Sequence, residues 1–296
     1  MAAPEEEDDP FAHTRMTLGE HLGELRKRLF RGLAAVLVLF VVALFFRDPI
    51  TELVLAPHFR SVAKLNEHYL SSARELVAQD PALSERYFDA DGQPRFLIDE
   101  RLEFLGPTEA MWFVFKVCGY FALFIGSPVL LWQLWQFVGA GLYEREKKWV
   151  RRFFAPALLL FMCGVVFSYM VLVPYGLFYL LKSVPIELVK PSMRLEFYFS
   201  FLATLSLGMG LIFQLPMLIT FLGTVGMVEP STFAKKRAYF VLAAFVIAAI
   251  LTPGPDLFSQ VCMAVPMVLL YEVGILGARI GRRRRMAAIA SEARPA

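Results

Sequence analysis

Residues 153–181 read FFAPALLLFMCGVVFSYMVLVPYGLFYLL and contain no Asp, Glu, Lys or Arg. A helix that crosses the hydrocarbon core of a membrane needs about 20 mostly apolar residues. This stretch has 29 residues, so it is long enough to cross the core with some tilt. It predicts a membrane-spanning α-helix.

Further apolar blocks lie on both sides of this stretch. They are Leu29–Phe46, Ala110–Val138, Phe197–Val225, Ala238–Leu251 and Leu257–Gly277. Over the whole chain of 296 residues, 57% are apolar and 19% are charged, whereas a soluble domain averages about 45–50% and 25%. The sequence therefore predicts an all-α membrane protein with six transmembrane helices in one domain, residues 16–280. An ordinary soluble domain is excluded.

The positions of proline and the lengths of the blocks predict kinks in some helices and a short final pair. Prolines lie within or beside five of the blocks, at Pro128, Pro156, Pro174, Pro216 and Pro266, which predicts kinked helices. The last two helices are predicted to be short: Ala238–Leu251 gives about 21 Å of helix against a core of about 30 Å. The pair either spans a thinned bilayer or forms a re-entrant hairpin, joined by a tight turn at Thr252–Asp256.

Basic residues alternate between the loops and predict the orientation. They gather at Arg15, Arg26–Arg28 and Arg31, at Arg145, Lys147, Lys148, Arg151 and Arg152, at Lys235–Arg237, and at Arg279 and Arg282–Arg285. The positive-inside rule then places both termini, and the second and fourth loops, in the cytoplasm. Residues 1–15 are predicted to be a disordered acidic tail and residues 281–296 a basic cytoplasmic tail.

The first loop, residues 47–108, is long and net acidic. It has 7 Lys or Arg against 11 Asp or Glu, which suits an external segment. Within it, Lys64–Arg95 resembles an insertion. Leu65–Val77 is predicted to form a short helix and Ala90–Gly92 a turn.

The segment before the first apolar block, residues 17–31, is predicted to be an amphipathic helix. Thr17 and Glu20 fit a capping box, and one apolar stripe is formed by Leu18, Leu22, Leu25 and Leu29. Spacing alone favours a helix on the membrane surface, with Glu24 and Arg28 as an ordinary i,i+4 ion pair.

Two further acids, Glu144 and Glu146, lie in the basic second loop. Most such charge runs are solvated loops with local ion pairs. Acids at both cytoplasmic positions can alternatively form a carboxylate pocket for a cationic ligand. The spacing alone leaves both interpretations open.

Gln214 lies close to the middle of its predicted helix. An intramembrane polar group indicates either function or a helix–helix hydrogen bond. The sequence has no P-loop, HExxH or GxSxG motif, and its three Cys residues have no metal-site spacing. These features predict a protein that is not an enzyme and has no cofactor or metal.

Several motifs, in order along residues 16–280, resemble the TatC family. They are His21–Leu29 (HLGELRKRL), Ser127–Phe137 (SPVLLWQLWQF), Gly141–Lys148 (GLYEREKK), Phe213–Pro216 (FQLP), Lys235–Arg237, Leu251–Asp256 (LTPGPD), Phe258–Gln260 and Pro266–Glu272. The resemblance implies the core multispanning subunit of a translocase that moves folded proteins across the prokaryotic plasma (inner) membrane, driven by the proton-motive force.

The resemblance also implies a binding site and partners. The ligands would be signal peptides that carry an Arg-Arg pair, and the site would include Glu24, Glu146, Phe137 and Arg26. Gln214 would contact the single-span TatA and TatB subunits. The expected partners are these subunits in an oligomeric complex, cargo signal peptides and membrane lipid, with no nucleic acid.

Two other kinds of protein fit parts of the pattern. Kinked helices and a midplane Gln214 also suit a secondary transporter for a small solute, although no inverted repeat is visible. A structural scaffold for other membrane subunits is the third possibility. Crosslinking of an Arg-Arg signal peptide, but not a Lys-Lys one, separates the three.

Overall fold

The structure is a computed structural model that describes residues 18–89, 91–95, 97–141, 144–183, 192–252 and 257–292, without the side chains of residues 18, 144–149, 258, 259 and 288–292. The described regions are α-helical apart from connecting segments and two isolated β-bridges. The long helices are α1 (Leu18–Phe45), α2 (Arg47–Gln79), α4 (Pro107–Ala140), α5 (Glu144–Phe167), α6 (Val173–Lys182), α7 (Leu195–Ile212), α8 (Leu215–Val225), α10 (Arg237–Leu251) and α11 (Leu257–Glu292). Two shorter helices are α3 (Ser84–Tyr87) and α9 (Pro230–Lys235).

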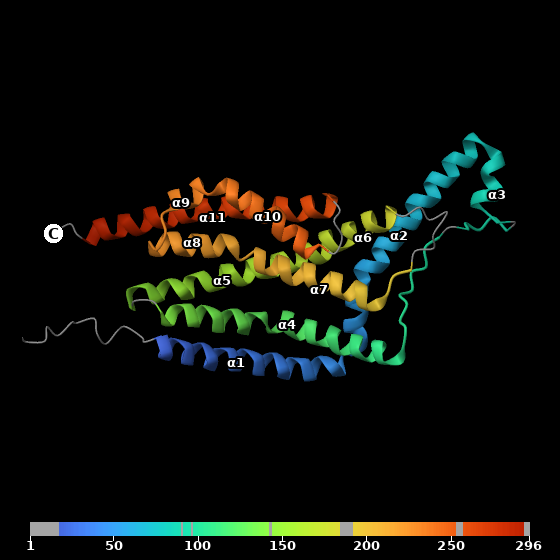
Figure 1. Ribbon diagram of the computed structural model, residues 1–296. Helices are drawn as coiled ribbons and strands as arrows, with labels where there is room; N and C mark the ends of the chain where they lie inside the picture. The colour runs from blue at the N-terminus through green and yellow to red at the C-terminus, as the bar shows by residue number, and fades with distance from the viewer. Residues whose placement is uncertain are drawn as a thin grey trace, which may run out of the picture.

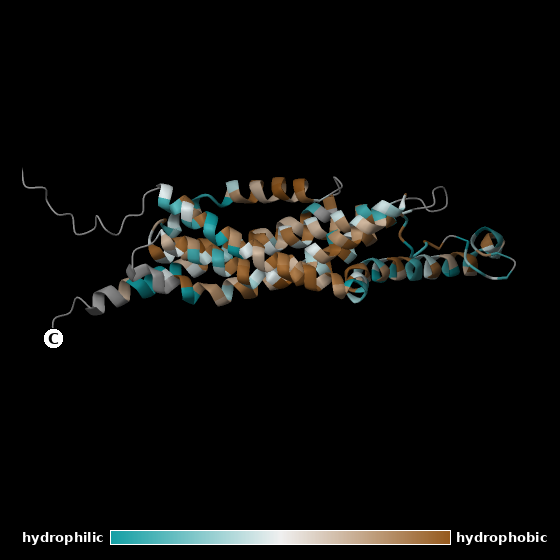
Figure 2. Cartoon of the chain, turned by 90° about the horizontal axis from the view of Figure 1, so that it is seen from below, coloured by the Kyte–Doolittle hydropathy of each residue, from teal (hydrophilic) through white to brown (hydrophobic). Residues whose placement is uncertain are grey.

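The bundle has two distinct ends (Figure 1). The basic end holds the start of α1, the end of α4, the start of α5, the end of α8 and the last turns of α11. The arm end carries the second half of α2 together with α3, which project from the bundle as an arm. Hydrophobic residues occupy the middle of the bundle, and hydrophilic residues follow the arm (Figure 2).

Among the described residues, five helical stretches are long and apolar enough to cross a membrane. They are Gly19–Phe45, Pro107–Ala140, Val150–Lys182, Leu195–Val225 and Gln260–Ala287. Each covers most of a block predicted from the sequence. The remaining predicted span, Ala238–Leu251, corresponds to α10, which has 15 residues.

Helix α1 lies at the edge of the bundle and packs antiparallel to α4. Between residues 19 and 45 only Gly32 and Ala43 are buried. A Cβ atom on Gly32 would lie 2.8 Å from Leu130 Cδ2, and one on Gly126 would lie 3.0 Å from Val36 Cγ2. The absence of side chains at these two positions lets the helices approach closely, as is common between membrane helices.

The third predicted span is divided by a π-helical turn, Ser168–Leu172, between α5 and α6. Pro174 lacks an N–H group, so it cannot continue the ordinary α-helical hydrogen bonds. In the π-turn, the N–H of Val173 donates to the carbonyl of Ser168, five residues earlier. The helix is therefore irregular next to Pro174, where the sequence predicts a kink.

The fourth predicted span is interrupted at Phe213 and Gln214, between α7 and α8, just before Pro216. Helix α7 is the centre of the largest hydrophobic cluster. Leu202 and Met209 are fully buried, and the Tyr198 hydroxyl donates to the Val54 carbonyl of α2 at 2.5 Å.

The last two helices differ from the prediction that both are short. Helix α10 is short, but α11 continues to Glu292 and includes most of the predicted basic tail. Arg237 and Glu272 pair between them at 2.7 Å, and Gln260 Nε2 donates to the Phe245 carbonyl at 3.0 Å. Of the predicted tight turn Thr252–Asp256, residues 253–256 lie outside the described residues, as does the tail at residues 1–15.

The segment predicted to be a long loop is largely helical. Helix α2 has 33 residues, far more than the predicted short helix at 65–77. Its first half packs on the bundle through Ile50, Val54, Pro57, His58, Ser61, Val62 and Leu65. Beyond α3, the Asp89 N–H donates to the Gln93 carbonyl at 2.9 Å and Gly92 has a φ of +73°, so the chain turns where the sequence predicts. Ala90 itself lies outside the described residues.

Candidate functional site

The basic end brings α1 and the end of α4 into contact through two rings. His21 stacks on Phe137, with 4.4 Å between ring centroids and 26° between planes. A Cβ atom on Gly141 would lie 3.4 Å from His21 Cε1, so the main chain of α4 also ends close to this ring. His21 thereby holds the half-buried Phe137 beside the first turns of α1.

Glu24 lies one turn after His21 and is engaged within its own helix. Its Oε1 atom is 2.5 Å from Arg28 Nη2, which is the i,i+4 pair that the spacing predicts. The Glu24 side chain is 24% exposed and the Arg28 side chain 16%. An i,i+4 ion pair on a helix contributes about 0.3–0.5 kcal/mol to stability. Arg28 therefore balances the charge of the carboxylate but holds it only weakly.

Arg28 also links this carboxylate to α4. Its Nη1 atom donates to Gln136 Oε1 at 3.3 Å, next to Phe137. Its Nε atom is buried without a hydrogen-bond partner among the described residues. Glu24, Arg28 and Gln136 therefore form a continuous polar link between the two helices.

Arg26 lies apart from this link. Its guanidinium carbon is 5.8 Å from the centroid of the Phe30 ring, and the side chain is exposed. Residues two apart on a helix do not face each other. The structure therefore does not bring Arg26 to Glu24.

Glu146 lies in the first turn of α5, and its side chain is outside the described part of the structure. The backbone placement is nevertheless informative, because α5 folds back on α4. A Cβ atom on Gly139 would lie 3.2 Å from Val150 Cγ2, and Trp135 stacks on Phe153 with 6.2 Å between centroids. The first turn of α5 therefore lies at the basic end, as do Glu24 and Phe137.

Gln214 makes a hydrogen bond inside the chain. Its Nε2 atom donates to the Ala157 carbonyl of α5 at 2.9 Å, and the residue is partly buried. The bond is made at the break between α7 and α8. Of the two roles that the sequence leaves open for Gln214, the helix–helix hydrogen bond is present in the structure.

The C-terminal helices are also joined at the basic end. Arg285 donates to the carbonyls of Thr224, at 3.2 Å, and Val225, which accept at the end of α8. Arg282 pairs with Glu229 at 3.0 Å and holds the pKa of that carboxyl below its ordinary value. These contacts give the predicted basic tail a structural role that its charge alone does not reveal.

Sequence reasoning did not identify His21, Arg28 and Gln136 as one cluster. The pairing of Arg28 with Glu24 can be predicted from their i,i+4 spacing in the sequence. The contacts of His21 and Gln136 join positions more than 100 residues apart, and no local pattern reports such a pairing.

These features define a multi-pass α-helical membrane protein with a cluster of charged and aromatic side chains at one end. The model of the family described as Sec-independent protein translocase protein (TatC) matches residues 20–266. The chain belongs to this family. Its members are components of a protein translocase, transport subunits rather than enzymes.

Individual relatives agree over nearly the whole chain. The TatC protein of Desulforapulum autotrophicum is 33% identical over 282 residues, which cover 95% of this chain and 88% of the relative. The TatC protein of Escherichia coli K12 is 32% identical over 266 residues, 89% of each chain. A crystal structure of a twin-arginine translocase receptor, TatC, is 30% identical and superimposes with a TM-score of 0.64, covering 88% of this chain and 99% of that one.

Proposed function

We propose that this chain is the signal-peptide receptor and core subunit of a twin-arginine translocase in a prokaryotic plasma (inner) membrane. In this role it takes part in moving folded proteins across the membrane with the proton-motive force. The observation that carries the proposal is the shared location of Glu24, Phe137 and the first turn of α5 at the basic end. The similarity to the crystal structure of a twin-arginine translocase receptor supports the same role.

The chemistry of the site suits a pair of arginines. A guanidinium group presents N–H donors that match the two oxygens of a carboxylate, which Lys cannot do. One arginine of the peptide would take over the Glu24 carboxylate from Arg28, and the other would pair with Glu146. Phe137 would pack against the apolar residues that follow the arginines. Arg26, on another face of α1, would contact the peptide or lipid outside this pair.

Peptide crosslinking tests this function against the two alternatives, a small-solute transporter and a structural scaffold. A signal peptide with a photoreactive residue next to Arg-Arg is added to the chain in nanodiscs, and labelled fragments are mapped. We expect labels in the first turns of α1 and at the end of α4, and strong loss of labelling when Lys-Lys replaces Arg-Arg. Equal labelling by both peptides would contradict the receptor function.

The proposal includes six membrane crossings with both termini in the cytoplasm. Reporter fusions after residues 90 or 190 are expected to be external, and fusions after residues 148, 236 or 286 cytoplasmic, because Lys and Arg concentrate at the basic end. Alkaline phosphatase and green fluorescent protein fusions report the two sides. A cytoplasmic signal at residue 190 would contradict the six-helix topology.

Gln214 is proposed to lie at the contact with the single-span TatA and TatB subunits. Gln214→Leu is expected to weaken their co-purification with this chain while leaving signal-peptide binding unchanged. Because the substitution also removes the bond to Ala157, the chain alone should lose about 0.5–1.5 kcal/mol of stability. Equal loss of subunit association and of peptide binding would argue against this contact.

A further inference from the structure

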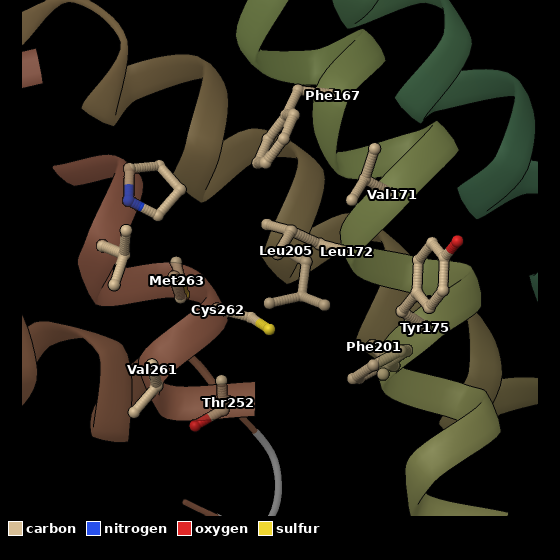
Figure 3. A pocket seen from close by; sticks show the side chains of 13 residues that line it. Phe167, Val171, Leu172, Tyr175, Phe201, Leu205, Thr252, Val261, Cys262 and Met263 are labelled. Atoms are coloured by element: carbon tan, nitrogen blue, oxygen red, sulfur yellow. The ribbon is translucent and has the colours of Figure 1, made fainter. Parts of the chain in front are cut away.

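An apolar cavity of about 330 Å³ lies between the π-turn region, α7 and the first turns of α11 (Figure 3). Its walls include Leu172, Tyr175, Leu205, Val261, Met263 and Val265. The volume falls within the range of about 300–1,000 Å³ that is typical of small-molecule sites. Nothing in the receptor function described above uses this cavity.

The cavity follows from two irregular features of the helices around it. The π-turn Ser168–Leu172 interrupts the third span, and its last two residues, Val171 and Leu172, line the cavity. On the opposite side, the short α10 ends at Leu251, and Thr252 lines the cavity at that point. The Thr252 hydroxyl donates to the Ala248 carbonyl at 2.8 Å, so it is satisfied within its own helix.

The lining is accessible from the side and belongs to segments that are apolar enough to cross a membrane. The side chains of Val171, Val261 and Val265 all line the cavity and are 38–48% exposed. An apolar cavity offers water no hydrogen-bond partners. Its lining therefore suits hydrocarbon, either from the surrounding lipid or from an apolar helix.

The width of the occupant favours a single hydrocarbon chain. A helix with its side chains is about 10–12 Å across and rigid. A flexible acyl chain is narrower and can follow the irregular wall formed by the π-turn region and the start of α11.

A cation lies beside the cavity on the arm end. Tyr175 lines the cavity and is 48% exposed. Lys64, an exposed residue of α2, places its Nζ atom 5.3 Å from the centroid of the Tyr175 ring. An apolar cavity with an ammonium group beside one of its lining rings suits an acyl chain attached to a negatively charged head group.

We propose that this cavity binds one acyl chain of an anionic phospholipid, with the phosphate of the head group held by Lys64. The lipid fills the space between the end of α10 and the π-turn region and contacts both. This inference does not rest on the receptor function, so it is tested on the purified full chain without a signal peptide.

The chain is placed in nanodiscs of phosphatidylcholine with a fraction of phosphatidylglycerol that carries a diazirine in one acyl chain. After illumination, labelled peptides are located by mass spectrometry. We expect labels within residues 167–176 and 261–266. Val171→Trp places a larger side chain in the cavity, so the acyl chain should bury about two methylene groups fewer. This should reduce the labelling about fifteenfold. Met170→Trp is the matched control, because Met170 lies in the same π-turn, is 58% exposed and does not line the cavity.

The head-group contact is tested separately. Lys64→Gln should lower the labelling about fivefold, the typical contribution of one Lys near an anionic lipid surface, whereas Arg74→Gln on the same helix should not. Val265→Trp is a second variant in which a larger side chain fills the same cavity. The unfolding temperature of each variant reports whether the bundle is intact. Unchanged labelling in both Trp variants, or equal loss in Met170→Trp, would overturn the proposal. Displacement of the label by an added single-span apolar helix would assign the cavity to a protein partner instead.

Discussion

Alanine in place of Glu24 or Glu146 is expected to weaken binding of an Arg-Arg signal peptide about 10- to 150-fold, since a hydrogen bond to a charged group contributes about 1.5–3 kcal/mol. Each substitution would leave one guanidinium group of the peptide without its carboxylate partner. The dissociation constant is measured by fluorescence anisotropy, with a labelled peptide titrated against the chain in nanodiscs.

Both variants should keep their unfolding temperature. Loss of the Glu24 side chain removes the i,i+4 pair with Arg28, which is worth about 0.3–0.5 kcal/mol, while Arg28 keeps its hydrogen bond to Gln136. Glu144→Ala is the matched control for Glu146→Ala, because both acids lie in the first turn of α5, and it should change the affinity much less. A double variant of Glu24 and Glu146 that still prefers Arg-Arg to Lys-Lys would refute the site.

Gly223→Ala is expected to destabilise the chain by about 1–3 kcal/mol through overpacking. Gly223 lies on α8 where it meets α11, and a Cβ atom there would be 2.5 Å from Ala278 Cβ and 3.2 Å from Ala278 Cα. Ala278 is fully buried, so the two helices must move apart to admit the methyl group. Thermal unfolding in detergent measures the loss.

The opposite sign is expected at an open position. Gly23→Ala on α1 meets nothing within 4 Å, and replacing Gly with Ala inside a helix stabilises by about 0.5–1 kcal/mol. Adding Ala278→Gly to Gly223→Ala removes one of the two clashing methyl groups and should restore part of the stability. If Gly223→Ala and Gly23→Ala have the same effect, packing between α8 and α11 is not the cause.

The membrane helices are the part of the fold that sequence predicts well. Phe153–Leu181 and Phe197–Val225 each lie within a stretch of the structure long enough to cross a membrane, because lipid requires about 20 apolar residues in a row. The interruptions are also readable, since Pro174 and Pro216 mark the π-turn and the break between α7 and α8. The length of α11 cannot be predicted from the sequence, because its last turns are basic and resemble a solvated tail.

Helix α2 is underestimated from sequence for a different reason. Its residues are polar on average, and Pro57 inside it resembles a helix break. The buried positions Ile50, Val54, His58, Ser61 and Leu65 are nevertheless spaced by three or four residues, which is the pattern of one helical face. Mixed polar and apolar residues on that face hide the pattern.

The candidate site is predictable only in part. The Glu24–Arg28 pair follows from helical spacing. The stacking of His21 on Phe137 depends on how α1 and α4 pack, which is set by close approach at Gly32 and Gly126 rather than by any local motif. Tertiary packing therefore decides which of the charged residues share one location.

The placement of α1 beside α4 also bears on how the chain is made. Residues 46–106 separate the two helices, and at a synthesis rate of about 5–20 residues per second α1 waits about 3–12 s for its partner. Once α4 and the first turn of α5 have emerged, the groups around Glu24 can assemble while α7, the centre of the core, is still unmade. A nascent chain therefore acquires the contacts around Glu24 before it acquires α7, which lies at the centre of the largest hydrophobic cluster.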